Sequence, residues 1–351
     1  MSLKLALRLD IYRAANLRVP IELVLEAERL GFHSVWSAEA YGTDALSPLA
    51  YLAGLTRRIR LGTAVVQLAA RPPTTLAMHA MTIDALAGGG RVIIGVGVSG
   101  PQIVEGWYGQ PWGRPNQRLR DYIAIVRKVI DRSEPVTHDG PELSLPYNGP
   151  GAIGQGKPLR SILHAVAPIP IWMASGGPRN TELCAEVCDG WLPMGLPPEG
   201  LAAYKDELAR GFSRRSDGVT AAEFETFVGC SVQITDDVAA VLDGMRPLTA
   251  MYVGGMGSAT HNYHRDAMAR RGFPDQAARI QELWLAGRKE EAVRTVPDEY
   301  LEQGALIGSE QRIRRRWEEG IAAPGVTGLI LGANRAEELQ LVAELAGISP
   351  D

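Results

Sequence analysis

Cysteine is scarce in this chain of 351 residues, with Cys184, Cys188 and Cys230 the only three present. Three cysteines cannot build a disulfide framework, and Cys184 and Cys188 have no further ligands nearby at a spacing that suits a metal. We therefore expect buried, reduced thiols and a cytoplasmic protein.

Long hydrophobic runs and a surplus of positive charge are also missing. No apolar run approaches the length of a membrane-spanning helix, and residues 1–4 lead into a strand pattern rather than a signal peptide. The formal net charge is −4, and the densest basic cluster, at 312–316, is followed by Glu318 and Glu319. That arrangement is typical of a solvated helix face, so we expect neither a membrane nor a nucleic acid as partner.

What the chain does contain is a repeated unit of a short apolar run, a turn and an amphipathic helix. Continuous apolar strands alternating with helices predict parallel strands that are buried on both faces, and eight such units fit a closed (β/α)8 TIM barrel better than an open sheet. A barrel site would lie at the carboxyl ends of the strands. The expected strands are Leu3–Ile11, Ser34–Ala38, Ile59–Leu68, Arg91–Val98, Ile171–Ala174, Asp189–Pro193, Thr226–Ile234 and Gly325–Leu331.

Two irregular excursions interrupt this rhythm, one after strand four at 133–168 and one after strand seven at 247–308. The first is rich in proline and glycine, and the second holds two helical patterns. We expect one barrel domain over residues 1–351 with these excursions forming the substrate pocket. The expected helices include Val19–Leu30, Leu46–Thr56, Thr75–Ala87, Asp275–Ala286, Lys289–Thr295 and Arg335–Ala346.

The end of strand four carries a glycine motif, Gly-Val-Gly-Val-Ser-Gly at 95–100, which matches the nicotinamide-binding pattern G-x-G-x-x-G. A Rossmann unit is contradicted by its context, because three strand–helix units precede the motif and the candidate acid, Asp121, lies inside an amphipathic helix. The glycines still allow close approach of a ligand to the backbone, where free N–H groups favour an anion.

A second turn of this kind follows strand five, with the sequence Ser-Gly-Gly-Pro at 175–178. Pro178 suits the first position of a helix, whose free N–H groups and dipole would face the barrel mouth. Two such turns on adjacent strands fit either one phosphorylated cofactor or two ordinary tight turns. The residues alone leave these alternatives evenly balanced.

A resemblance to a known family favours the phosphorylated cofactor, because several long segments resemble that family in the same order along the chain. The segments at 36–45, 99–109, 188–193, 252–257 and 296–299 resemble the luciferase-like F420-dependent oxidoreductases, in particular an actinobacterial branch of that family. The resemblance covers nearly the whole chain. It implies a deazaflavin, coenzyme F420, that lies across the strand ends with its phosphate held by the turns after strands four and five.

The same resemblance implies a non-proline cis peptide at Ala64–Val65, behind the ring of the cofactor. The residues that it assigns to cofactor binding are Ala64, Val65, Gly97, Val98, Ser99, Gly100, Ser175, Gly176 and Gly177.

The chain departs from its relatives at two places. Glu39 is followed by Ala40, where many relatives have histidine, and the strand-four glycines are followed by Pro101 and not by the glutamate of sugar-phosphate-oxidising relatives. An incomplete acid–base pair argues against sugar-phosphate oxidation. The expected reaction is hydride transfer between F420 and a small organic substrate, which could be an alkene, an imine, or an alcohol or carbonyl compound.

The candidate catalytic residues near the strand ends are Glu39, Asp44 and Tyr108. Apolar neighbours would favour the neutral, proton-donating form of Glu39, and the alternative is a carboxylate hydrogen-bonded to backbone. His261 and His264 lack a third ligand, so we expect no metal site.

Two other functions remain open: an FMN-dependent monooxygenase with a partner reductase, and a flavin- or deazaflavin-binding barrel without catalysis. An F420 reductase is a further possible partner. Relatives commonly pair, so we expect a homodimer.

Overall fold

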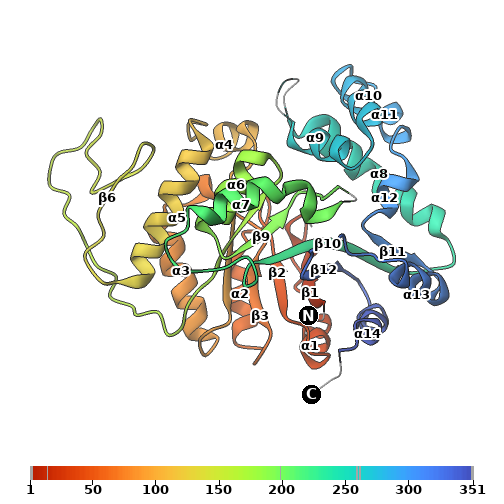
Figure 1. The fold of residues 1–351 in the computed structure, drawn as a ribbon, viewed down its shortest axis with the longest axis horizontal. Coiled ribbons are helices and arrows are strands. Elements are labelled where there is room, and N and C mark those ends of the chain that lie inside the picture. The colour runs from red at the N-terminus through yellow and green to blue at the C-terminus, as the bar shows by residue number, and fades with distance from the viewer. Residues whose placement is uncertain (1–2, 14, 198, 258–259, 261, 349–351) are drawn as a thin grey trace.

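The computed structural model describes residues 3–13, 15–197, 199–257, 260 and 262–348, which form a barrel of parallel strands with helices outside it (Figure 1). Within these residues eight strands form the ring, which β10 closes by pairing with both β9 and β12. The predicted (β/α)8 barrel is confirmed. The ring strands are β1 (Lys4–Arg8), β2 (Ser34–Ser37), β3 (Arg60–Thr63), β5 (Val92–Gly97), β8 (Ile171–Ser175), β9 (Gly190–Pro193), β10 (Glu225–Ile234) and β12 (Gly328–Gly332).

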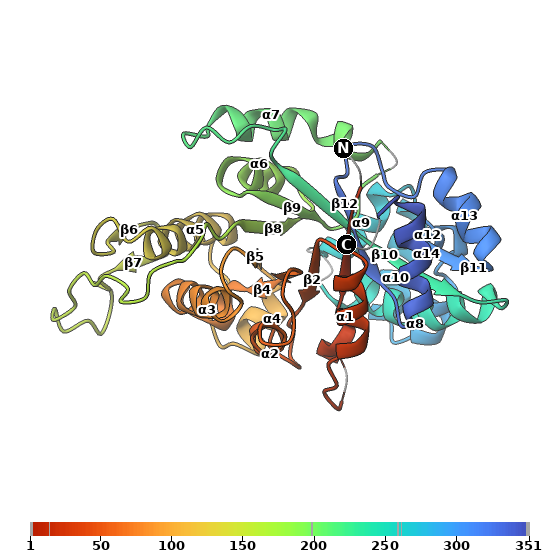
Figure 2. The same ribbon diagram turned by 90° about the horizontal axis from the view of Figure 1, so that it is seen from below.

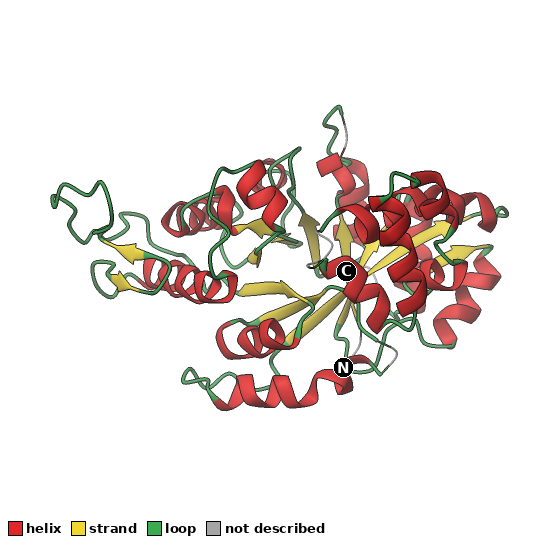
Figure 3. Ribbon diagram, turned by 90° about the horizontal axis from the view of Figure 1, so that it is seen from above, coloured by secondary structure: helices red, strands yellow, loops and turns green. Residues whose placement is uncertain are grey.

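The helices surround the strands, as the view coloured by secondary structure shows (Figure 3). Each expected helix exists, with ends that differ from the expected ones by no more than a few residues. The helices are α1 (Ile21–Arg29), α2 (Leu46–Ala53), α3 (Pro73–Leu86), α4 (Pro101–Gly106), α5 (Pro115–Asp131), α6 (Pro178–Val187), α7 (Lys205–Ser213), α8 (Val238–Gly255), α9 (Tyr263–Arg270), α10 (Pro274–Leu285), α11 (Lys289–Arg294), α12 (Asp298–Glu302), α13 (Glu310–Glu318) and α14 (Ala336–Leu345).

The barrel interior is filled by three large aromatic side chains, each of which lies over a glycine of the next strand. These pairs are Trp36 with Gly62, Trp172 with Gly190, and Phe227 with Gly328. A Cβ atom on any of these glycines would come within 2.4 to 2.5 Å of the facing ring. The interior is therefore a packed core and leaves the strand ends as the place for a site.

The first excursion projects from the barrel beside α5 and contains a short hairpin of β6 (His138–Asp139) and β7 (Ser144–Leu145) (Figures 1 and 2). Asp121 of α5 holds this hairpin, because its Oδ2 accepts hydrogen bonds from the backbone N–H groups of Glu142 and Leu143 at 2.8 and 3.0 Å. Asp121 therefore has a structural role, in agreement with the rejection of a Rossmann unit.

The second excursion forms a helical lobe of α8 to α12 with an apolar cluster of its own. The lobe begins earlier than predicted, at Val238. It ends in a strand that the sequence analysis missed, β11 (Ala305–Gly308), which pairs in parallel with Ser231–Ile234 of β10. The four-residue apolar run was missed because it lies among helical patterns. Its pairing extends β10 beyond the ring and attaches the lobe to the barrel mouth.

The basic cluster, the cysteines and the helix lengths bear on the properties expected from composition. The basic cluster lies on α13, where Arg314 pairs with Glu344 at the surface and Arg315 is exposed, whereas Arg312 and Arg316 are only 26% and 21% exposed and pair with Glu302. The predicted solvated helix face therefore holds for part of the cluster only. All three cysteines are buried and unpaired, as predicted. None of the described helices combines the length and apolar character needed to cross a membrane.

Candidate active site

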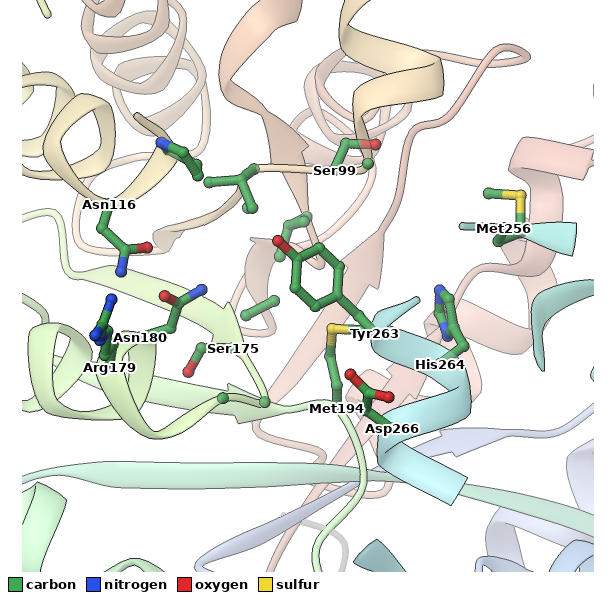
Figure 4. Close-up of a pocket in the computed structure, with 18 of the residues that line it drawn as sticks. Ser99, Asn116, Ser175, Arg179, Asn180, Met194, Met256, Tyr263, His264 and Asp266 are labelled. Atoms are coloured by element: carbon green, nitrogen blue, oxygen red, sulfur yellow. The ribbon is translucent and has the colours of Figure 1, made fainter. Parts of the chain in front are cut away.

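A cavity of about 940 Å³ opens at the carboxyl ends of β5, β8 and β9, between the barrel and the helical lobe (Figure 4). Of the nine predicted cofactor-binding residues, all but Ala64 line it. The lining residues are Val65, Gly97, Val98, Ser99, Gly100, Gln102, Ile103, Gly113, Arg114, Pro115, Asn116, Gln117, Ala174, Ser175, Gly176, Gly177, Pro178, Arg179, Asn180, Met194, Gly255, Met256, Tyr263, His264, Asp266 and Arg270. The structure therefore brings both predicted turns to one cavity.

The peptide bond between Ala64 and Val65 is cis, as the family resemblance implies. Val65 lies at the inner wall of the cavity opposite Gly97, where a Cβ atom would be only 2.7 Å from Cγ2 of Val65. Glycine at 97 thus leaves the room that Val65 occupies. The two residues form an apolar inner wall against which a flat ring could lie.

The turn after β8 offers hydrogen-bond donors to an anion. Gly177 is the N-cap of α6 in an extended conformation, no side chain caps this helix, and Pro178 is at the first helical position as predicted. A Cβ atom on Gly177 would meet nothing within 4 Å, so the end of the helix faces open space. The Oγ atom of Ser175, buried beside it, has no hydrogen-bond partner among the described residues. The free N–H groups, the helix dipole and this hydroxyl all suit a phosphate.

The turn after β5 faces the same space. Ser99 has a φ of 61°, in the left-handed region, which turns the chain sharply before α4. Strands β5 and β8 are paired neighbours, so the two turns are adjacent at the cavity wall.

The lobe places a positive charge opposite the turn after β8. Arg270, the last residue of α9, lines the cavity, and its Nη2 atom would lie 3.1 Å from a Cβ atom on Gly176. Its Nε atom is buried without a hydrogen-bond partner in the described part of the chain. A buried guanidinium nitrogen without an acceptor is costly, and an anionic group bound at the turn would supply one. Arg270 was not predicted from the sequence, because the lobe reaches the turn only in the tertiary structure.

The three predicted catalytic residues lie together beside the loop after β2, and none of them lines the cavity. The Glu39 carboxylate accepts hydrogen bonds from the backbone N–H groups of Gln67 (2.8 Å) and Ala45 (3.1 Å). It also forms a bidentate ion pair with Arg71, with N–O distances of 3.1 and 2.8 Å. The side chains of Glu39 and Arg71 are 3% and 12% exposed. This geometry corresponds to the structural alternative, in which the carboxylate is bound by backbone and holds loops together.

Asp44 and Tyr108 also make local contacts. Oδ1 of Asp44 accepts hydrogen bonds from the N–H groups of Leu46 and Ser47, each at 2.8 Å, at the start of α2. Burial by itself would raise the pKa of Asp44, but these hydrogen bonds outweigh it and lower that pKa. The hydroxyl of Tyr108 donates to the carbonyl oxygen of Ala40 at 3.2 Å, and burial raises its pKa. Both side chains are thus occupied in shaping the loop after β2.

Comparison with known proteins places this architecture in a family. The family model described as luciferase-like monooxygenase matches residues 4–328. The chain belongs to the luciferase-like family. One relative is Rv3520c of Mycobacterium tuberculosis, whose name is putative coenzyme F420-dependent oxidoreductase. It is 43% identical over 347 residues, which cover 98% of this chain and 99% of that protein. The expected actinobacterial branch is thereby confirmed.

More distant luciferase-like proteins share the architecture. The 5,10-methylenetetrahydromethanopterin reductase of Archaeoglobus fulgidus is 24% identical over 328 residues, which cover 91% of both chains. The structure of the coenzyme F420 dependent tetrahydromethanopterin reductase from Methanopyrus kandleri superimposes with a TM-score of 0.73 at 21% identity, covering 98% of both chains. The latter likeness shows that the barrel fold is shared.

A histidine that the sequence analysis had considered only as a metal ligand lies at the inner side of this luciferase-like site. His264 of α9 lines the large cavity and also a second, smaller one, and its ring lies 4.7 Å from that of Tyr252. Burial lowers the pKa of His264 to about 4, so its imidazole is neutral at neutral pH. His261 lies outside the described residues, and no cluster of three possible metal ligands is found in the rest.

The lowered pKa predicts a pH dependence of stability. Between about pH 6.5 and pH 4 the unfolded chain binds a proton at His264 and the folded chain does not, so the free energy of unfolding falls as the pH falls through this window. Replacing His264 by Asn should reduce that fall by about 3 kcal/mol. Urea unfolding of both proteins at pH 7 and pH 4 measures the difference, and an equal fall in both would contradict it.

Proposed function

We propose that the protein is an F420-dependent oxidoreductase that transfers hydride between the deazaflavin and a small organic substrate. The observation that carries the proposal is the convergence of three anion-binding features on one cavity: the turn at Ser99, the N-terminus of α6 at Gly177, and the guanidinium of Arg270. The near-full-length likeness to Rv3520c supports F420 as the cofactor. When bound, F420 supplies a ring that accepts or donates a hydride.

The residues present fit this group. The apolar wall of Val65 and Gly97 would support the ring, and Ser99, Ser175 and Gly177 would bind the phosphate. Two more arginines line the same cavity: Arg179, and Arg114, whose Nε also pairs with Glu142 at 2.6 Å. F420 carries carboxylates beyond its phosphate that FMN lacks, so these positive charges favour F420 over FMN.

His264 is the residue of this chain that we propose to act at the reacting atoms. It lies between the two cavities, and in its neutral form it can donate a hydrogen bond to a carbonyl or imine, or accept one from an alcohol. Glu39, a candidate proton donor in the sequence analysis, is committed to Arg71 and to backbone N–H groups. The substrate type, whether alkene, imine or alcohol and carbonyl, stays open in this proposal.

Separate titrations of the protein with F420 and with FMN test the cofactor assignment, followed by a search for turnover with the better ligand. We expect the fluorescence of F420 to decrease when it binds. We also expect F420 to bind at least about tenfold more tightly than FMN, as one or two additional charged contacts would give. Tighter binding of FMN would instead favour the monooxygenase with a partner reductase. Tight binding of F420 without turnover of any alkene, imine, alcohol or carbonyl compound would favour the non-catalytic alternative.

We further propose that the protein is a cytoplasmic homodimer whose subunits pair through α2 and α3. Tyr51 on α2 and Met78 and Leu86 on α3 are large, exposed apolar side chains, and none of the exposed residues within these two neighbouring helices is charged. Exposed Leu55 follows just after the end of α2. An exposed apolar surface of this kind marks an interaction site. The buried, unpaired cysteines agree with a reducing compartment.

Replacing Leu86, whose side chain is 63% exposed, by Arg should convert the dimer to a monomer while the subunit stays folded. A buried, unpaired charge at a two-fold interface occurs twice and is strongly unfavourable. Sedimentation velocity on the wild type and on the variant measures the change. Leu17→Arg, at an exposed leucine outside α2 and α3, is the matched control, and a dimer that survives Leu86→Arg rules out this interface.

A further inference from the structure

A second cavity, of about 370 Å³, adjoins the cofactor cavity and shares Met194 and His264 with it as lining residues. It lies at the ends of β1, β9 and β10 and is covered by α8, α9 and α12 of the lobe. A volume of this size suits a small organic molecule. Its lining residues are Arg8, Met194, Gly195, Gly229, Ser231, Met245, Leu248, Thr249, Tyr252, Val253, His264, Ala267, Arg271, Tyr300, Leu301 and Gly304.

The barrel contributes one positive charge to this second cavity. Arg8 is the last residue of β1, and its Nε donates to Oδ2 of Asp10 at 3.0 Å. Its terminal nitrogens lie over two glycines. A Cβ atom added to Gly229 would be 3.7 Å from Nη1 of Arg8, and a Cβ atom added to Gly332 would be 2.2 Å from Nη2. These glycines make room for the guanidinium across the barrel mouth. Among the described contacts, the two terminal nitrogens have no protein acceptor.

The lobe contributes the second positive charge. Arg271 follows α9, and its side chain passes over Gly195, where a Cβ atom would be 3.0 Å from Cδ. Its Nε donates to Oε1 of Gln303 at 3.0 Å and its Nη2 to the carbonyl oxygen of Tyr300 at 3.2 Å, while the guanidinium lies 4.2 Å from the centroid of the Tyr300 ring. These partners are neutral, so they fix the guanidinium in place without cancelling its charge.

The charges of the second cavity are unbalanced. Its described lining contains both arginines and no carboxylate, and Asp10 is the acid paired with Arg8. Most of the other side chains are apolar, among them Met245, Leu248 and Leu301. A guanidinium held by neutral partners in a partly buried site is suited to bind an anionic oxygen pair.

From this geometry we propose that the second cavity is the substrate site and takes a small, mostly apolar molecule with one anionic group, a carboxylate or a phosphate, held by Arg8 and Arg271. That the bound molecule is the hydride partner rests on the proposed function, because only then does the shared wall of Met194 and His264 face the cofactor. The proposal that this cavity binds an anion depends only on the two arginines and not on the proposed function.

Calorimetric titration of the full-length protein with hexanoate, hexanamide and hexyl phosphate tests the site, each with and without saturating F420. We expect the better of the two anions to bind at least tenfold more tightly than the amide, because charge-assisted hydrogen bonds are worth more than neutral ones. The comparison of hexanoate with hexyl phosphate tells which anion the site takes. In Arg271→Met and in Arg8→Met the preference should fall below about threefold, and Arg271→Lys should keep part of it.

Arg279→Met is the matched control, since Arg279 is an exposed arginine of the same lobe that pairs with Glu282; it should keep the full preference. Thermal melting shows that each variant is folded. Equal binding of anions and amide to the wild type, or a full preference in both methionine variants, overturns the proposal, and so does loss of anion binding when F420 saturates the protein. A failure of F420 to bind leaves the titrations without F420 unchanged, so the two proposals fail separately.

Discussion

Replacing Gly177 by Asp is expected to weaken F420 binding strongly and to leave the fold at least as stable as before. Gly177 is the uncapped N-cap of α6, its backbone is extended and space for a side chain is open, so Asp fits there and can cap the helix. The new carboxylate would occupy the position that we assign to the cofactor phosphate. Two anions at one site repel each other, and the N–H groups that would bind the phosphate become satisfied by the cap. We expect affinity to fall by about a hundredfold or more.

Gly177→Asn is the matched control, because Asn also caps helices and has nearly the same shape without the charge. It should lose much less affinity than Gly177→Asp. F420 fluorescence titration measures the binding, and thermal melting measures the stability. Equal affinities for the Asp and Asn variants would show that no anion is bound at this turn, and the cofactor placement would then fail.

Glu39→Gln is expected to lower the free energy of unfolding by about 3 to 5 kcal/mol, because it leaves the buried Arg71 guanidinium without its counter-charge. An amide also cannot accept hydrogen bonds at both of its terminal atoms, whereas the carboxylate accepts from Gln67, Ala45 and Arg71 at once. A difference of this size moves the midpoint of urea unfolding well outside experimental error.

The double variant Glu39→Gln with Arg71→Met provides the control. If the ion pair is the cause, removing both partners should cost clearly less than the sum of the two single variants, since no unpaired charge is left. A Glu39→Gln protein with unchanged stability and strongly reduced turnover at saturating F420 would contradict the structural role. It would return Glu39 to the proton-transfer role predicted from the sequence.

Several parts of the fold could be predicted from the chain alone. The apolar runs at β5, β8, β9 and β10 were located to within a few residues, and their number pointed to the closed barrel. Periodicity is a local property, so it survives without knowledge of tertiary contacts. Strand β11 was not predicted, because four apolar residues between helical patterns carry no period of their own.

Within the candidate site, the backbone turns could be predicted from the sequence, whereas the surroundings of the functional side chains could not. The turns at Ser99 and Gly177 were predictable, since glycine and proline after a strand mark tight turns and helix starts wherever they occur. The backbone hydrogen bonds of Glu39 agree with the structural alternative, but its apolar sequence neighbours gave no sign of Arg71, a partner 32 residues away. Arg270 and His264 carried no local signal that links them to a cofactor.

Local patterning was thus sufficient for the barrel, its alternation of strands and helices, and the backbone turns that face its mouth, because each depends on residues close together in the chain. The side-chain chemistry of the mouth depended on folding. The lobe returns Arg270, Arg271 and His264 to the strand ends from far along the chain, and burial there lowers the pKa of the His264 imidazole. Electrostatic environment is a property of contacts in space, and no spacing in the sequence encodes it.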